Sequence, residues 1–119
     1  MSLTLGVDFD NTVSSDPKMF TALAKSVKRS AGHVHVITGV PKKSSIDAQQ
    51  HAATVQSSLD NMGFPYDTIY VAPKPVPANK AAYCKANGVD LFIDNTPKNV
   101  KKVAKVTSAA RYRTPKKAQ

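Results

Sequence analysis

The sequence contains no glutamate and no tryptophan, and Cys84 is its only cysteine. One cysteine cannot form a disulfide within the chain, which fits the cytoplasm, where thiols stay reduced. No apolar stretch approaches the roughly 18 residues that a membrane-spanning helix needs. The first residues, 1–6, lack the basic and apolar regions of a secretory signal peptide. We therefore expect a cytoplasmic protein with no membrane partner.

Because glutamate is missing, eight aspartates are the only acidic residues, against 17 lysines and arginines, and the net charge is +9. A surface with this charge attracts phosphates and nucleic acids. The same charge also fits a cationic surface that only keeps the protein soluble. Both interpretations stay open at this point.

The apolar pattern alternates between short strands and helices. Strands are expected over 3–9, 33–37, 68–72, 89–93 and, more weakly, 108–112. Helices are expected from Pro17 to a stop at Gly32, from about Ser45 to Gly63, over 79–87, and from Pro97 onward. The three prolines of 73–77 predict an extended loop.

This alternation predicts a three-layer α/β/α, Rossmann-like fold with a central, mainly parallel sheet. A chain of 119 residues is in the size range of one domain. We expect that domain to cover residues 1–113 and a flexible basic tail to cover 114–119.

Polar residues follow three of the expected strands where each strand ends. Asp8 and Asp10 lie at the end of the first strand, Thr38 and Gly39 at the end of the second, and Asp94-Asn95 at the end of the fourth. The carboxyl ends of parallel strands meet at one edge of a sheet, and ligands of such sheets bind there. These side chains are therefore expected to converge.

The same residues resemble the motifs of the haloacid dehalogenase (HAD) superfamily of phosphatases. Val-Asp-Phe-Asp-Asn-Thr-Val, at 7–13, resembles a strand followed by Asp-x-Asp-x-Thr. Ile-Thr-Gly at 37–39 and Leu-Phe-Ile-Asp-Asn at 91–95 resemble the second and fourth motifs. The resemblance implies an HAD-like fold over most of the chain. The intervals between the motifs are too short for the inserted cap domain usual in this superfamily, so an open site is expected.

The resemblance further implies a Mg²⁺-dependent phosphomonoester hydrolase that works through an aspartyl-phosphate. Asp8 is the implied nucleophile, Asp10 the general acid and base, and Thr12 a brace for the turn. The implied substrate-binding residues are Phe9, Thr38, Gly39, Lys74 and Lys80. The implied Mg²⁺ ligands are Asp8, the main-chain carbonyl of Asp10, Asp94 and Asn95. The family often has a second acidic residue where this chain has Asn95.

Two lysines compete for the catalytic position that neutralises charge. Lys80 lies 14 residues before Asp94, a spacing that fits a helix leading into the fourth strand. Lys74, in Lys-Pro-Val-Pro, resembles the form used by other branches of the family. The spacing favours Lys80, and Lys74 stays open as the alternative.

Several residues are more simply structural. His33 and His35 share one face of a strand and are expected to be packed or edge-exposed. Small or aromatic core residues are expected at Tyr70, Tyr83, Cys84 and Phe92. The last helix has a basic face that suits either solvent or phosphate contacts, formed by Lys98, Lys101, Lys102 and Lys105.

Three functions remain in competition. The first is a phosphatase of a nucleotide or of a nucleic-acid terminal phosphate, suggested by the charge and the open site. The second is a phosphatase of a small phosphorylated sugar or other metabolite. The third is a non-catalytic nucleic-acid-binding protein that retains the fold. The oligomeric state stays open.

Overall fold

The computed structural model describes residues 2–41 and 47–113 of the chain. Two predictions fall outside these ranges: the helix start near Ser45 and the flexible tail over 114–119.

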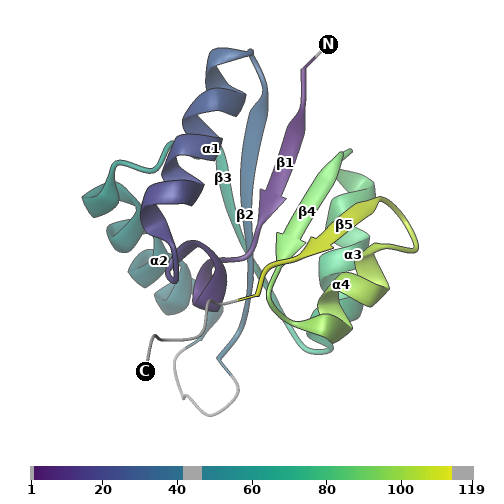
Figure 1. The fold of residues 1–119 in the computed structure, drawn as a ribbon. Coiled ribbons are helices and arrows are strands. Elements are labelled where there is room, and N and C mark those ends of the chain that lie inside the picture. The colour runs from purple at the N-terminus through teal and green to yellow at the C-terminus, as the bar shows by residue number, and fades with distance from the viewer. Residues whose placement is uncertain (1, 42–46, 114–119) are drawn as a thin grey trace, which may run out of the picture.

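Five strands form a single sheet in which every neighbouring pair is parallel. They are β1 (Thr4–Val7), β2 (His33–Gly39), β3 (Thr68–Ala72), β4 (Leu91–Asp94) and β5 (Ser108–Arg111). The strand order is β3-β2-β1-β4-β5, with β1 at the centre (Figure 1). The predicted α/β class and the weak fifth strand are confirmed.

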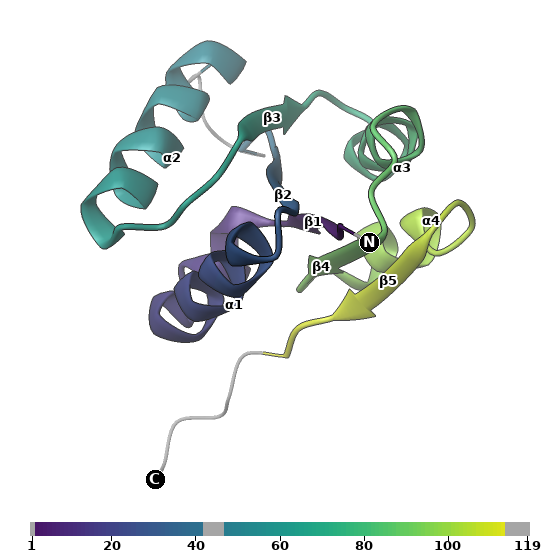
Figure 2. The same cartoon turned by 90° about the horizontal axis from the view of Figure 1, so that it is seen from above.

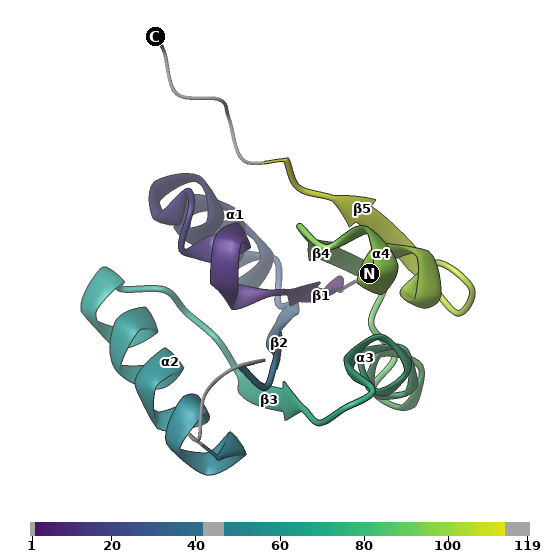
Figure 3. The same ribbon diagram turned by 90° about the horizontal axis from the view of Figure 1, so that it is seen from below.

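Two pairs of helices cover the two faces of this sheet. They are α1 (Pro17–Arg29) and α2 (Ala48–Met62) on one face, and α3 (Val76–Ala86) and α4 (Pro97–Val103) on the other (Figure 2 and Figure 3). The molecule is therefore a three-layer, Rossmann-like α/β/α sandwich. Within the described ranges, no helix combines the length and the apolar character needed to cross a bilayer.

Side chains from alternate strand positions fill a hydrophobic core on each face of the sheet. The core beneath α1 and α2 includes Leu5, Val7, Phe20, Val34, Val36, Val55 and Leu59. The core beneath α3 and α4 includes Ile37, Ala81, Cys84, Val89, Phe92 and Val103. Tyr70 and Tyr83 pack against the second core with their rings stacked. The predicted core positions at Cys84 and Phe92 are confirmed, and Tyr70 and Tyr83 are partly buried against them.

The segment 73–77 differs from its prediction, because α3 begins inside it, at Val76. Pro77 lies in the first turn of that helix. A first turn does not use its backbone N–H groups for helical hydrogen bonds, so proline is compatible with it. The early start places Lys80 in the second turn of α3, close to the ends of the strands.

The end of α1 also differs from its prediction. The left-handed residue that ends the helix is Ala31 (φ 62°) and not Gly32. Gly32 N–H donates to Val27 O and Ala31 N–H to Lys28 O, which is the Schellman arrangement. Gly32 is needed for a different reason, since a Cβ there would lie 2.4 Å from the main-chain oxygen of Leu3.

Exchanging residue types at these two positions tests this turn. Ala31→Gly relieves the left-handed strain of an L-residue and is expected to stabilise the protein by about 1 kcal/mol. Gly32→Ala forces the turn away from the residues before β1. We expect this change to destabilise the protein by more than about 2 kcal/mol. Urea denaturation of both variants measures the difference. A stable Gly32→Ala variant would contradict the close approach.

Candidate active site

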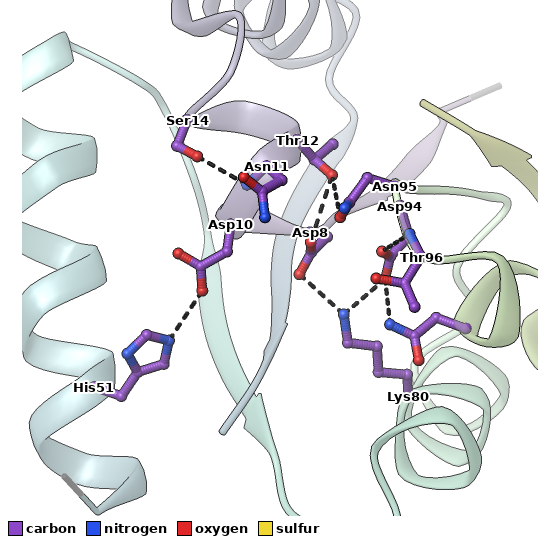
Figure 4. Close-up of polar contacts among 11 residues, drawn as sticks. Asp8, Asp10, Asn11, Thr12, Ser14, His51, Lys80, Asp94, Asn95 and Thr96 are labelled. Carbon is purple, nitrogen blue, oxygen red and sulfur yellow. Dashed lines mark hydrogen bonds and ion pairs between the residues drawn. The ribbon is translucent and has the colours of Figure 1, made fainter. Parts of the chain in front are cut away.

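The polar residues at the ends of β1 and β4 lie together (Figure 4), at the edge of the sheet where β2 also ends (Figure 1). They border a cavity of about 760 Å³ that opens to solvent. The predicted site residues that line it are Asp8, Asp10, Thr38, Gly39, Lys74, Lys80 and Asn95. The convergence expected from the strand ends is therefore present in the structure.

Lys80 occupies the centre of this group. Its Nζ lies 2.9 Å from Asp8 Oδ1 and 2.7 Å from Asp94 Oδ2 (Figure 4). The Lys80 side chain is only 1% exposed. Lys74 is exposed and borders the cavity from outside. Of the two competing lysines, the structure brings Lys80 to the predicted nucleophile.

Asp94 is fully buried, and both of its carboxylate oxygens already accept hydrogen bonds. Oδ1 accepts from Thr96 N–H at 2.9 Å, and Oδ2 accepts from Lys80 Nζ and from Asn99 Nδ2 at 3.0 Å. It does not line the cavity. Its place in the structure is that of an anchor for Lys80, and its oxygens are not presented to the cavity as those of a metal ligand would be.

Asn95 lies where the predicted metal ligands meet. One atom of its side-chain amide lies 3.1 Å from Asp8 Oδ2, 3.1 Å from the main-chain oxygen of Asp10 and 3.3 Å from Thr12 Oγ1. With nitrogen at that position, the amide donates to both Asp8 and Asp10. With oxygen at that position, the amide oxygen faces two other acceptors, Asp8 Oδ2 and the main-chain oxygen of Asp10. Only a cation or a proton between them relieves that repulsion.

These contacts would suit a small octahedral cation only with the Asn95 amide oxygen turned toward Asp8 and Asp10, whereas hydrogen bonding favours the amide nitrogen there. Mg²⁺ takes oxygen ligands at about 2.0–2.1 Å, which separates adjacent ligands by about 2.9–3.0 Å. The 3.1 Å contacts of Asn95 are close to that value. No three His, Cys or Asp side chains gather as a metal site anywhere in 2–41 and 47–113. A cation here would therefore use Asp8, a carbonyl and an amide, and Asn95 fits it better than Asp94 does.

Burial raises the pKa of Asp8 to about 7. The ammonium of Lys80 opposes this shift, while the negative charge of Asp94 adds to it. A carboxyl group in this position ionises readily only when more positive charge is brought to it. The second Asp8 oxygen, which faces Asn95, is the place where such charge would act.

The loop after β1 presents Asp10 to solvent. Asn11 adopts a left-handed conformation (φ 60°), and its N–H donates to Ser14 Oγ at 2.9 Å. The Asp10 side chain is 56% exposed as a result. Thr12 is fully buried, with its hydroxyl 3.4 Å from Asp8 Oδ2. This position agrees with the bracing role expected of Thr12.

Thr38, at the end of β2, is a further polar residue that lines the cavity. It is fully buried, and its hydroxyl has no hydrogen-bond partner within the described part of the chain. A buried hydroxyl without a partner costs about 1–3 kcal/mol. At Gly39, a Cβ would lie 2.8 Å from Val76 Cγ1, so glycine lets α3 approach the end of β2.

Phe9 contributes no side chain to the cavity. Its ring is 8% exposed and belongs to the core beneath α1 and α2. Phe9 is also not among the residues that line the cavity, so the structure does not bring it to the site with the other predicted substrate-binding residues.

Two residues of the site were not identified from the sequence. Asn99, in the first turn of α4, donates to Asp94, and His51, in the first turn of α2, lies 3.5 Å from Asp10 Oδ2. Each of these helices is the next helix after a strand that ends at the site, β4 for α4 and β2 for α2. A polar residue in such a first turn is the signal that could have revealed them.

The other two histidines are structural, as predicted. His33 is exposed at the start of β2. His35 is half-buried, and its Nδ1 lies 2.8 Å from the hydroxyl of Tyr83. Burial lowers the pKa of His35.

No model of a known protein family matches this chain, and no curated protein matches it. Inferences about its chemistry rest on the motifs and on the geometry described above.

The raised pKa of Asp8 gives a stability prediction. Between about pH 4 and pH 7 the folded state holds a proton on Asp8 that the unfolded state has lost, so wild-type stability decreases as pH rises through this window. Asp8→Asn removes the ionisable group. In EDTA, the variant is expected to be more stable than wild type at about pH 8, with a smaller difference at about pH 5. Urea denaturation at both pH values tests this, and a variant less stable than wild type at the higher pH contradicts it.

Proposed function

We propose that this protein is a magnesium-dependent phosphomonoester hydrolase in which Asp8 is the nucleophile. The observation that carries the proposal is the contact of buried Lys80 with Asp8 at the base of an open cavity. An ammonium in that place offsets the repulsion between a carboxylate and an anionic phosphate. A buried ion pair can also be purely structural. The unpartnered hydroxyl of Thr38 at the same cavity favours the catalytic interpretation.

The reaction takes two steps that use Asp8 and Asp10. First, an Asp8 oxygen bonds to phosphorus as the bond from phosphorus to the leaving oxygen breaks, and Asp10 gives its proton to that oxygen. The products are a free alcohol and an aspartyl-phosphate. Water then bonds to phosphorus as the bond to Asp8 breaks, and Asp10 takes a proton from the water. Inorganic phosphate leaves, and both carboxyl groups return to their starting states.

Two further groups complete the proposed site. Asp8, the main-chain carbonyl of Asp10 and the amide oxygen of Asn95 would hold Mg²⁺, which supplies positive charge for the phosphate oxygens when bound. The Thr38 hydroxyl would donate to a phosphate oxygen, because it lines the cavity and lacks a partner. Lys80 stays beside Asp8 throughout and neutralises charge.

The distribution of charge supports an anionic substrate larger than phosphate itself. Each of the eight aspartates has a polar partner in the described structure. Only Lys28 and Lys80, among the described lysines and arginines, form an ion pair with an aspartate. The other basic side chains are not neutralised within the described structure.

Two of these basic side chains, Lys74 and Lys98, are exposed and line the cavity. Cations at the entrance attract a substrate that has further phosphates beyond the reacting one. Between β1 and β2 the described chain has only the short helical turn Phe9–Val13 and α1, and neither is a cap domain. A nucleotide or a nucleic-acid end fits this entrance better than a small sugar phosphate.

Phosphate release tests the chemistry. Wild type with Mg²⁺ is expected to hydrolyse p-nitrophenyl phosphate, and EDTA is expected to stop it. Asp8→Asn is expected to lower kcat at least about 1,000-fold, because the nucleophile is lost. Circular dichroism confirms that the variant is folded. Equal inactivity of wild type and variant, across several divalent metals and a broad phosphate panel, would leave the non-catalytic nucleic-acid-binding function.

The role of the entrance is tested with two matched pairs of substitutions. Lys74→Ala with Lys98→Ala removes two charges at the cavity, and Lys25→Ala with Lys85→Ala removes two exposed charges elsewhere. On a terminally phosphorylated oligonucleotide, the first pair is expected to raise KM about tenfold and to weaken its salt dependence. On p-nitrophenyl phosphate, KM is expected to change little. If KM for the oligonucleotide changes equally in both double variants, or changes in neither of them, the entrance lysines do not have this role.

A further inference from the structure

His51 stands apart from the catalytic groups proposed above, yet it faces one of them. It is 9% exposed, and its Nε2 has no hydrogen-bond partner within the described ranges. Among the described residues, the charged side chain that pairs with this nitrogen is that of Asp10, whose Oδ2 lies 3.5 Å away (Figure 4). A buried polar nitrogen without any partner costs about 1–3 kcal/mol, and this carboxylate is the group placed to satisfy it.

The position of His51 in α2 explains how it reaches Asp10. His51, Val55 and Leu59 are the buried residues of the helix, spaced four apart, so all three face the same core. Val55 and Leu59 are apolar, and His51 occupies the one buried position beside the edge of the sheet. Asp47 caps the helix there by accepting from Gln50 N–H at 2.8 Å, and His51 N–H donates to Asp47 O. The imidazole therefore projects from a rigid first turn.

Asp10 is, by contrast, held loosely by its own loop. Its side chain is 56% exposed, and His51 is the one side chain within ion-pair distance of it in the described structure. A solvent-exposed carboxylate samples several rotamers, and a general acid must be aimed at the leaving oxygen to act. A fixed imidazole beside it reduces that freedom.

We infer that His51 is a positioning residue that aims the Asp10 carboxyl at the leaving group. This inference rests on the proposed function, because it assigns a role within that reaction. His51 does not line the cavity and does not touch the substrate. It acts only through Asp10.

Two substrates of similar shape separate positioning from general damage to the fold. Phenyl phosphate releases a strongly basic phenolate, which needs a proton, whereas p-nitrophenolate is stable without one. The kcat/KM value reports the first phosphoryl transfer, in which Asp10 protonates the leaving oxygen. If the Asp10 carboxyl is no longer oriented toward the leaving oxygen, kcat/KM should therefore fall more for phenyl phosphate than for p-nitrophenyl phosphate.

His51→Phe keeps a ring in the core and removes the nitrogens. We expect kcat/KM for phenyl phosphate to fall about tenfold and that for p-nitrophenyl phosphate to fall less than about threefold. Asp10→Asn is expected to change the ratio of the two kcat/KM values in the same direction and by a larger factor. His51→Gln, whose amide can replace Nε2, is expected to keep the wild-type selectivity.

Val55→Ala is the matched control, because it loosens the same buried face of α2 one turn farther on, without removing a polar group. It is expected to lower stability and leave the ratio of the two kcat/KM values unchanged. His51→Leu provides the same measurement should the Phe variant not fold. Suppose that wild type shows hydrolysis that depends on Asp8. Equal losses of kcat/KM on both substrates in the His51→Phe variant, or wild-type kcat/KM on both, then overturn the role of His51 and leave the proposed function standing. A wild type with no hydrolysis that depends on Asp8 overturns the proposed function and this role together.

Discussion

The arrangement of the site depends on one buried cation. Lys80 is inside the protein between Asp8 and Asp94, and a charge so placed is tolerated only with close partners of opposite charge. Lys80 is in α3, Asp94 ends β4 and Asp8 follows β1, so the ion group joins the start of the chain to two elements far from it in the sequence. Asn99 and Thr96 donate to Asp94 and complete its hydrogen bonds. The result is a rigid base from which Asp8 faces the cavity with one oxygen held.

The parallel sheet is what makes this grouping achievable. Each crossover helix returns the chain to the opposite edge, so every strand ends at the same side, and polar residues placed after the strands converge without any local sequence relation. Helices that start at that edge add a second set of groups from their first two turns. His51 in α2, Asn99 in α4 and Lys80 in α3 all come from helices that start there. Strand ends supply the reacting carboxylates, and helix starts supply the groups that fix them.

The strands and the convergence were predictable because apolar runs ending in polar residues are a local signal. The start of α3 was not, since Pro77 in a first turn looks in the sequence like a loop residue. The choice between Lys74 and Lys80 needed coordinates, because it depends on where a helix begins and how far an ammonium reaches. Asp94 and Asn95 were both expected as Mg²⁺ ligands, but Asp94 faces Lys80 and Asn99 while only Asn95 lines the cavity, a difference in side-chain direction that spacing alone does not predict. His51 was missed because a histidine in an apolar helical face is ordinarily a core residue, and its contact with Asp10 is between distant segments.

If Asp8 is the nucleophile, phosphate must pass through a covalent bond to that side chain. The most direct measurement is the mass of the peptide that contains Asp8, after wild-type protein is mixed with substrate and Mg²⁺ and quenched in acid within its first turnovers. We predict the added mass of one phosphoryl group on that peptide, located on Asp8 by fragmentation and absent from Asp8→Asn. Phosphate release by wild type with this peptide always unmodified, or with the phosphoryl group on another residue, would contradict the central role given to Asp8.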